Sequence, residues 1–298
     1  MPKRSKLPGY IAFTVSVFRI VLKYWRPFLL LLTLYVLVSL LIVGFTQQDQ
    51  FRSLTEAIDE INKEAGEDVL GGIYQVAGIF GVTLMGSLNS SLSEIQQFYM
   101  AIIYTMTWLI LIWLLRHLMA GNVVRVRDAV YNAGAPLVSS ICILALMLLQ
   151  ALPGAIGLFI FSIATQNSIF SDGVSAMCFG ILALLLVVMS LYWLTSSFFA
   201  FLIVTIPGTY PMSAVRGAAD LALGRRTQLL IRLIWLLLLI VLIWAILVIP
   251  ALFIDDWLNV SWLPLVTIMV QVATAISFIV SVTYIYTLYR RMIDDPAK

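Results

Sequence analysis

The side chains that could do chemistry in this chain are few, and most lie in or beside long apolar runs. His117 is the only histidine, and Cys142 and Cys178 are the only cysteines. A lone histidine beside Arg116 suits a helix end in contact with water better than a metal site, and thiols within apolar runs usually act as packing residues. The sequence contains no His-Glu-x-x-His, Gly-x-Ser-x-Gly or phosphate-loop motif. We therefore expect no enzymatic activity, no catalytic residues, no bound metal and no cofactor.

Two prolines and two glutamines form the best candidate for a binding cavity. Pro153 stands in Ala-Leu-Pro-Gly, directly before Gly154, and Pro250 stands in Val-Ile-Pro-Ala. A proline inside a helix frees a carbonyl oxygen that can meet a substrate or an ion, and Gln150 and Gln271 could add hydrogen bonds. The alternative is that the prolines are packing kinks and that each glutamine bonds across helices, with a contribution of about 0.6 kcal/mol.

The elements that position these residues follow from the composition. The chain has 298 residues, of which 62% are hydrophobic and 11% charged, and its mean hydropathy is +1.02; an ordinary soluble domain is roughly half apolar and about one quarter charged. Most of the chain therefore needs lipid as its solvent, where backbone groups must be bonded within helices or closed barrels. Runs of about 20 apolar residues predict spanning helices. We predict an all-α integral membrane protein whose six transmembrane helices are residues 28–46, 99–118, 137–163, 176–206, 229–253 and 263–288.

The basic residues predict the orientation of these helices. With the amino terminus in the cytoplasm, all of the 18 Lys and Arg residues except Arg52 and Lys63 fall on the cytoplasmic side, as the positive-inside rule requires. Both termini and residues 1–27, 119–136 and 207–228 are then cytoplasmic, in a bacterial inner or plasma membrane. Arg232 lies a few residues inside the fifth span, as the deepest basic residue, and is expected to snorkel to the surface. The interfacial basic residues are predicted to be Arg19, Lys23, Arg26, Arg125, Arg127, Arg216, Arg225 and Arg226. The small net charge of +3, without a dense basic block, argues against nucleic acid as a partner.

Residues 47–98 form the main extracytoplasmic feature in this topology. Leu54, Ile58 and Ile61 share one helix face, which predicts an amphipathic surface helix. Residues 69–88 are a seventh apolar run, rich in glycine, but a seventh crossing would move the arginines after the second span outside. We therefore predict an amphipathic and re-entrant or interfacial insertion at 47–98.

A weak threefold repeat is present along the chain. Each third opens with a basic amphipathic stretch, at 10–26, 120–135 and 210–228, and continues into two spans. The third stretch is predicted to lay an apolar stripe on the membrane, formed by Met212, Val215, Ala218, Ala219 and Ala222. We predict three parallel repeats of a cytoplasmic amphipathic helix plus a helix pair, which lack the inverted symmetry of many transporters.

The residues between the fourth and fifth spans carry a family resemblance. They read Thr-Tyr-Pro-Met-Ser-Ala-Val-Arg-Gly-Ala-Ala-Asp-Leu-Ala-Leu-Gly-Arg-Arg. The stretch resembles the Pro, Ala, Leu and Gly-basic signature of bacterial multi-pass membrane proteins related to the membrane domain of glycerophosphodiester phosphodiesterase. The matching positions are Pro211, Ala214, Leu223, Gly224 and Arg225. The resemblance implies a six-helix inner-membrane protein and does not imply hydrolase activity, since the catalytic domain of that enzyme is a separate soluble barrel.

Two functions are compatible with these features. The first is a non-enzymatic subunit, scaffold or envelope-maintenance factor of a membrane complex, whose partners are the lipid bilayer and either another protein or a second copy of the chain. Such a partner would meet the insertion at 47–98, the faces of small residues and the tryptophans within spans, which are Trp108, Trp113, Trp193, Trp235 and Trp244. The second is a transporter or channel-like permease for a lipid, a peptide or a small apolar solute, which would use the predicted cavity. The spans carry no ionisable residue near their middle, and this favours the first function.

Overall fold

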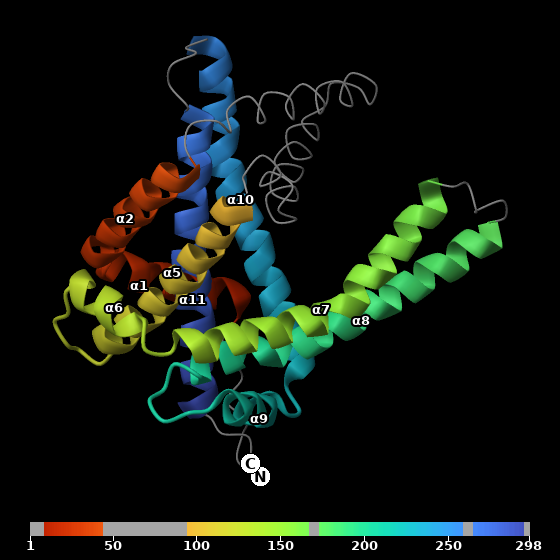
Figure 1. The fold of residues 1–298 in the computed structure, drawn as a ribbon, viewed down its shortest axis with the longest axis horizontal. Coiled ribbons are helices and arrows are strands. Elements are labelled where there is room, and N and C mark those ends of the chain that lie inside the picture. Colours follow the sequence, from red (N-terminus) through yellow and green to blue (C-terminus); the bar gives the residue numbers. More distant parts are fainter. Residues whose placement is uncertain (1–8, 44–93, 167–172, 259–264, 295–298) are drawn as a thin grey trace. The chain divides into compact units, whose positions relative to one another are not determined.

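The structure, a computed structural model, describes residues 9–43, 94–166, 173–258 and 265–294 (Figure 1). Within these ranges every regular element is a helix, and six helices are long and apolar enough to cross a membrane. These six are α2 (Trp25–Val43), α5 (Glu94–Met119), α7 (Leu137–Gln166), α8 (Gly173–Ile203), α10 (Arg226–Leu258) and α11 (Leu265–Asp294). Each overlaps one of the six predicted spans, so the all-α fold with six potential crossings is confirmed.

The long helices extend beyond the apolar runs that predicted them. The predicted insertion at 47–98 lies outside the described residues except for its last five, which already belong to α5. Polar residues can extend an apolar helix at its ends because the terminal backbone groups are solvated or capped. Basic side chains in a last turn also interact favourably with the helix dipole, as Arg116 and His117 do in α5 and Arg291 does in α11.

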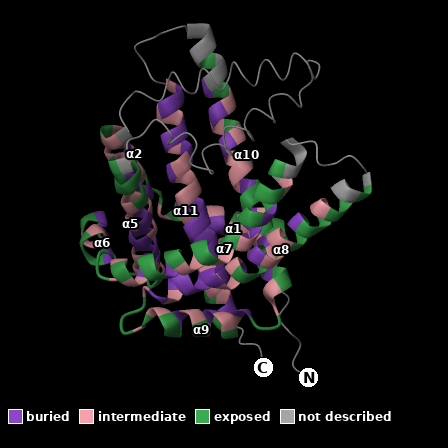
Figure 2. Cartoon of the chain, turned by 45° about the vertical axis from the view of Figure 1, so that its right-hand side comes forward, coloured by how far each residue is buried: buried purple, intermediate pink, exposed green. Residues whose placement is uncertain are grey.

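Three short helices lie in the segments predicted to be cytoplasmic and amphipathic. They are α1 (Tyr10–Lys23), α6 (Val126–Ala133) and α9 (Pro211–Ala222). Each buries one stripe of residues spaced three or four apart, which places the stripe on a single helix face (Figure 2). The stripes are Phe13 and Val17 in α1, Val126, Ala129 and Ala133 in α6, and Ala214, Ala218 and Ala222 in α9.

The described chain divides into two compact units. Residues 134–234 and 285–294 form the α7–α8 unit, which also contains α9 and the adjoining ends of α10 and α11. Residues 9–133 and 235–284 form the α11 unit, which contains α1, α2, α5, α6 and the greater part of α10 and α11.

Helices α7 and α8 are an antiparallel pair that lies side by side (Figure 1). Their contacts fix the register: Gln150 meets Ser197, Gly154 meets Ser190, and Gly157 meets Leu186. Only 17% of the apolar span of α7 and 11% of that of α8 are buried. The pair therefore contacts the rest of its unit over a small part of its surface.

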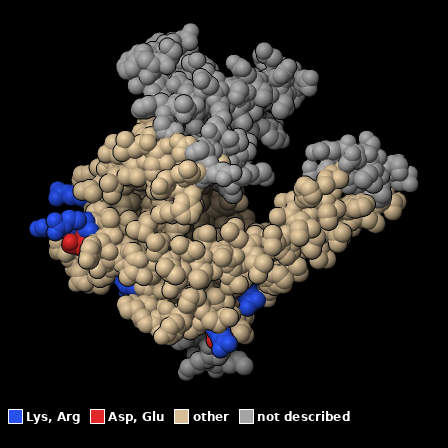
Figure 3. Space-filling model, in the orientation of Figure 1, with Lys and Arg blue, Asp and Glu red and all other residues tan. Residues whose placement is uncertain are grey.

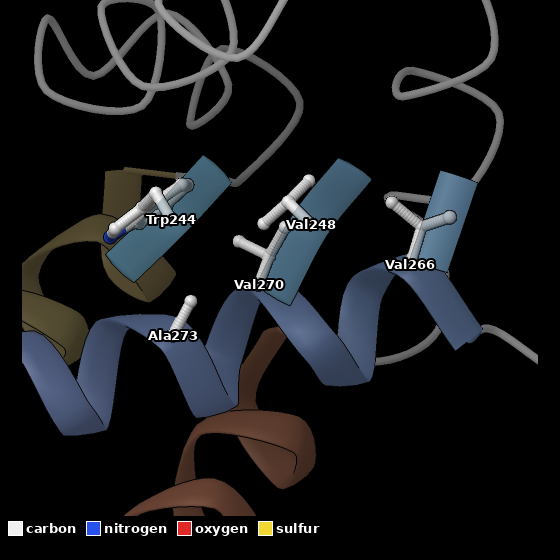
Figure 4. Packing of buried hydrophobic residues seen from close by; sticks show 5 residues of the cluster. All are labelled: Trp244, Val248, Val266, Val270 and Ala273. Atoms are coloured by element: carbon white, nitrogen blue, oxygen red, sulfur yellow. The ribbon is translucent and has the colours of Figure 1, made fainter. Parts of the chain in front are cut away.

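The α11 unit is built from two further antiparallel pairs. In the first, Tyr24 before α2 donates a hydrogen bond to Leu118 O of α5 at 3.0 Å, and Gln96 Nε2 of α5 donates to Ile42 O of α2 at 2.9 Å. In the second, the Trp244 indole of α10 donates to Ser277 Oγ of α11 at 3.0 Å, beside a cluster of buried apolar side chains (Figure 4). Of the apolar span of α11, 56% is buried, so this helix forms the core of its unit.

Candidate functional site

Gln150 lies in the interface between α7 and α8 and is hydrogen-bonded there. Its Oε1 accepts a hydrogen bond from Ser197 Oγ at 2.6 Å, and its backbone oxygen accepts one from Ser190 Oγ at 2.5 Å. Both donors belong to α8. This arrangement favours interhelical bonding for Gln150, the alternative to a cavity lining that the sequence left open.

Pro153 and Gly154 continue the same interface. Helix α7 runs unbroken through Pro153 as far as Gln166, although the proline cannot donate a backbone hydrogen bond. A Cβ atom on Gly154 would lie 3.0 Å from Ser190 Cβ, and one on Gly157 would lie 3.0 Å from Leu186 Cβ and 3.2 Å from Ala183 O. Such distances are tighter than most Cβ contacts in proteins, so a side chain here would push the neighbouring atoms away, and the two glycines let the backbones of α7 and α8 approach closely.

The other two residues of the predicted cavity lie in the α11 unit and differ in burial. Pro250 is on the exposed face of α10, and the helix continues past it to Leu258. Gln271 is buried in α11, with 6% of its surface exposed. Gln150 and Gly154 therefore lie between α7 and α8, with Pro153 next to them in the chain, whereas Pro250 is exposed on α10 and Gln271 is buried on α11.

Gln271 has a polar neighbour on α11 that the sequence did not single out. Thr267 lies one helical turn away on the same face and is fully buried. Within the described residues, no hydrogen-bond partner reaches Gln271 Oε1 or Thr267 Oγ1. A threonine inside a helix usually bonds the carbonyl four residues earlier, as Thr283 bonds Ile279 O at 2.6 Å. Thr267 is the third residue of α11, so the helix provides it with no such carbonyl.

The predicted interfacial basic residues are mostly at the surface, where they form separate groups (Figure 3). Arg225 and Arg226 are half-buried, and Arg226 Cζ lies 5.0 Å from the centroid of the Tyr192 ring in a cation–π contact. The six exposed members are Arg19, Lys23, Arg26, Arg125, Arg127 and Arg216. Arg232 differs from the expectation that it snorkels to the surface, because only 5% of its surface is exposed.

The amphipathic helix α9 divides the stripe that was predicted to lie on the membrane. Met212 is exposed, whereas Ala218 and Ala222 form a buried stripe with Ala214. The stripe packs on α8, where Gly217 faces Ile203. Alanines occupy this packed face because a small side chain permits two helices to approach closely.

The remaining side chains that could take part in chemistry are one histidine and two cysteines. His117 lies in the last turn of α5, where its ring stacks on Trp113 with centroids 3.9 Å apart and its Nδ1 lies 2.9 Å from Trp113 O. Cys142 and Cys178 are free and exposed. Within the described ranges, no three His, Cys, Asp or Glu side chains are grouped to hold a metal ion. Comparison of the chain with protein-family models, curated proteins and solved structures gives no match.

Proposed function

We propose that the chain is a non-enzymatic, multi-pass membrane protein that acts as a subunit, scaffold or envelope-maintenance factor of a membrane complex. The observation that carries this proposal is the surface of the α7–α8 pair. Across the pair, the hydroxyls of Ser190 and Ser197 already donate to the backbone oxygen and to Oε1 of Gln150. The outward surface is apolar, and its large exposed side chains include Leu148, Leu152, Ile156, Leu184 and Leu185.

Such a surface can be covered by lipid or by another membrane helix. Two helices that bury little against the rest of their own unit contribute little to its core, and an exposed apolar surface of this kind is a common place for a partner. A partner helix would associate by close packing, because lipid tails are as apolar as leucine and give no hydrophobic driving force. We therefore place the partner surface on α7 and α8.

Three parallel repeats are part of the same proposal, and the helix boundaries support them. Helix α6 ends at Ala133 and α7 begins at Leu137; α9 ends at Ala222 and α10 begins at Arg226. When the second and third repeats are aligned so that Ala133 matches Ala222, three further pairs match. They are Ala129 with Ala218, Ser140 with Leu229 and Ile143 with Arg232, and all eight residues are buried. Arg232 thus occupies the position of a buried isoleucine in the preceding repeat.

The packing of the short helices supports the repeats independently. Helix α6 packs on α5, α9 packs on α8, and α1 contacts α11 through Phe13 and Tyr284, whose ring centroids are 4.7 Å apart. In each case a short helix meets the second helix of a long pair. For α6 and α9 this is the preceding pair, and for α1 it is the last pair.

The antiparallel pairs are compatible with the proposed orientation. A helix pair that crosses the membrane twice returns the chain to its starting side, and Arg26 is at the start of α2, Arg116 in the last turn of α5 and Arg226 at the start of α10. We place this side and both termini in the cytoplasm of a bacterium, in accordance with the positive-inside rule. The relation to the glycerophosphodiester phosphodiesterase membrane-domain family stays a prediction; Pro211 begins α9, Ala214 lies on its buried stripe, and Gly224 takes a left-handed turn after it.

Photo-crosslinking in native membranes tests the proposed role. A photoreactive residue at Leu152 or Leu184, both exposed, is expected to capture another protein or a second copy of the chain. The matched control is Ile279 of α11, which is buried within the chain and should give only intramolecular products. Lipid adducts alone at both exposed positions, together with a monomer after gentle purification, would contradict the proposal.

A permease is the second candidate, and Thr267 and Gln271 support it. Two buried oxygens one turn apart, without a partner among the described residues, could accept hydrogen bonds from a peptide or from the polar group of a lipid. If they line a pathway, Thr267→Val and Gln271→Leu should abolish solute flux in reconstituted vesicles, with Thr283→Val as a control because its hydroxyl is bonded locally. Unchanged flux in both variants would exclude this pathway.

A further inference from the structure

The turn that joins α9 to α10 carries a pair of arginines that its backbone does not require. Gly224 has a φ of +74°, a conformation that L side chains rarely adopt, and the turn is closed by a hydrogen bond from Arg225 N to Ala222 O at 3.1 Å. Only the glycine is needed for this geometry. Arg225 ends the turn and Arg226 is the first residue of α10.

The corresponding turn between α6 and α7 shows that the connection forms without basic residues. It has the same length and consists of Gly134, Ala135 and Pro136. Both turns join a short helix with a buried alanine stripe to a long apolar helix. The path of the chain at the α9–α10 turn therefore does not require the two arginines.

Arg226 lies where the exposed apolar surface of α8 ends. Large exposed apolar side chains follow α8 from Val174 to Trp193, a length of about 30 Å at a rise of about 1.5 Å per residue, which matches the hydrocarbon thickness of a bilayer. Beyond Trp193 the helix is largely buried in its own unit and packs with α9. Tyr192, against which Arg226 stacks, is 43% exposed at this boundary. Tyrosine and tryptophan typically stand at the level of lipid headgroups.

The outward side of α9 and its turn combines apolar and basic side chains. Tyr210, Met212 and Leu223 are exposed, and Leu223, directly before Gly224, has 65% of its surface exposed. Arg216 is exposed on the same helix. Large apolar side chains beside arginines are typical of a surface that enters the boundary between headgroups and acyl chains. A site for free phosphate in water would not need them.

We propose that Arg225 and Arg226, with Tyr192, bind the headgroup phosphate of an anionic phospholipid whose acyl chains cover the exposed surface of α8 between Val174 and Trp193. The guanidinium of Arg226 is held in place by the Tyr192 ring, and arginine donates paired hydrogen bonds to phosphate oxygens. Arg225 adds a second positive charge next to it. The proposal rests on the membrane location of the chain and is independent of its role in a complex.

The test measures how much phosphatidylglycerol the full chain retains. The protein is placed in nanodiscs of phosphatidylcholine with phosphatidylglycerol, released gently, and analysed by native mass spectrometry. Arg225→Gln with Arg226→Gln should lower retention about 25-fold, since each arginine within reach of an anionic headgroup contributes about a factor of five. The matched control, Arg125→Gln with Arg127→Gln, removes the same charge from exposed positions at α6 and should lower retention by a clearly smaller factor.

Further arms separate binding from folding and lipid from phosphate. Arg225→Lys with Arg226→Lys keeps the charge and should retain most of the lipid, and Tyr192→Leu should lower retention by a smaller factor than loss of both arginines. Millimolar inorganic phosphate should not displace the lipid. Equal loss in the two glutamine pairs, or full displacement by phosphate, would overturn the proposal. Loss of the native elution volume in the glutamine variant, with no reduction of lipid retention in Tyr192→Leu, would also overturn it.

Discussion

The α7–α8 pair and α11 are equally apolar in sequence and differ in what surrounds them. Of the apolar spans of α7 and α8, 17% and 11% are buried, against 56% of that of α11. Polar side chains follow the same division. In the pair, Ser190 and Ser197 donate hydrogen bonds to Gln150 across the mutual interface, whereas α11 buries five polar side chains, at Thr267, Gln271, Ser281, Thr283 and Thr287. Apolar length shows that a segment leaves water, and the pattern of burial shows whether lipid or protein replaces the water.

The α7–α8 pair and α11 are each stabilised by a different kind of contact. The pair depends on close approach at Gly154 and Gly157, where small residues allow backbones to come near each other. Helix α11 depends on filled volume, since residues 279–288 are buried without interruption. Added atoms should therefore destabilise the α7–α8 interface, and removed atoms should destabilise the packing around α11.

The largest expected effect comes from removing atoms from α11. Ile279→Ala deletes a side chain that is 4% exposed and should lower the free energy of unfolding by about 2–5 kcal/mol, from lost contacts and the cavity left behind. Leu184→Ala on α8, where the side chain is 64% exposed, should change it by less than about 0.5 kcal/mol. Unfolding by titration with a denaturing detergent in mixed micelles measures both. Equal losses would show that a partner or another part of the chain covers Leu184 in the purified protein.

An intermediate effect is expected from adding atoms to α7. Gly157→Leu places a Cβ atom 3.0 Å from Leu186 Cβ and close to the backbone of Ala183, and it should cost about 1–3 kcal/mol. Gly180→Leu on α8 is the matched control, because its nearest atom would be Phe161 Cε2 at 3.8 Å. The same detergent titration applies. A control variant as unstable as Gly157→Leu would mean that Gly157 is not a point of close approach.

The sequence predicted the helices better than their faces. Six apolar runs were enough to place α2, α5, α7, α8, α10 and α11, because length and composition decide which segments can span. The stripe of α9 that was predicted to lie on the membrane included Ala218 and Ala222, which the structure buries together with Ala214. Hydropathy does not distinguish a residue that faces lipid from one that packs on another helix, and no single-sequence pattern reports which neighbour a helix will meet.

The candidate cavity shows the same limit. Gln150, Pro153 and Gly154 are near one another in the chain, so one helix brings them together whatever its neighbours are. Pro250 and Gln271 stand on separate helices, and their faces depend on tertiary packing that the sequence does not encode locally. Arg232 is a further example: its distance from the predicted helix end suggested snorkelling, but its position matches that of buried Ile143 in the preceding repeat.

The smallest expected effect concerns the polar bonds of the two regions. Removing the Ser197 hydroxyl and the Gln150 amide, singly as Ser197→Ala and Gln150→Leu and then together, should give a coupling energy of about 0.6 kcal/mol, the average for hydrogen bonds between membrane helices. The parallel cycle with Trp244→Phe and Ser277→Ala in the α10–α11 pair should give a similar value. The two bonds lie in different surroundings, one in a pair that faces outward and one beside a buried cluster. Agreement between the cycles would mean that these bonds fix the register of each pair while burial sets its stability, and a coupling above about 2 kcal/mol in only one pair would contradict this division.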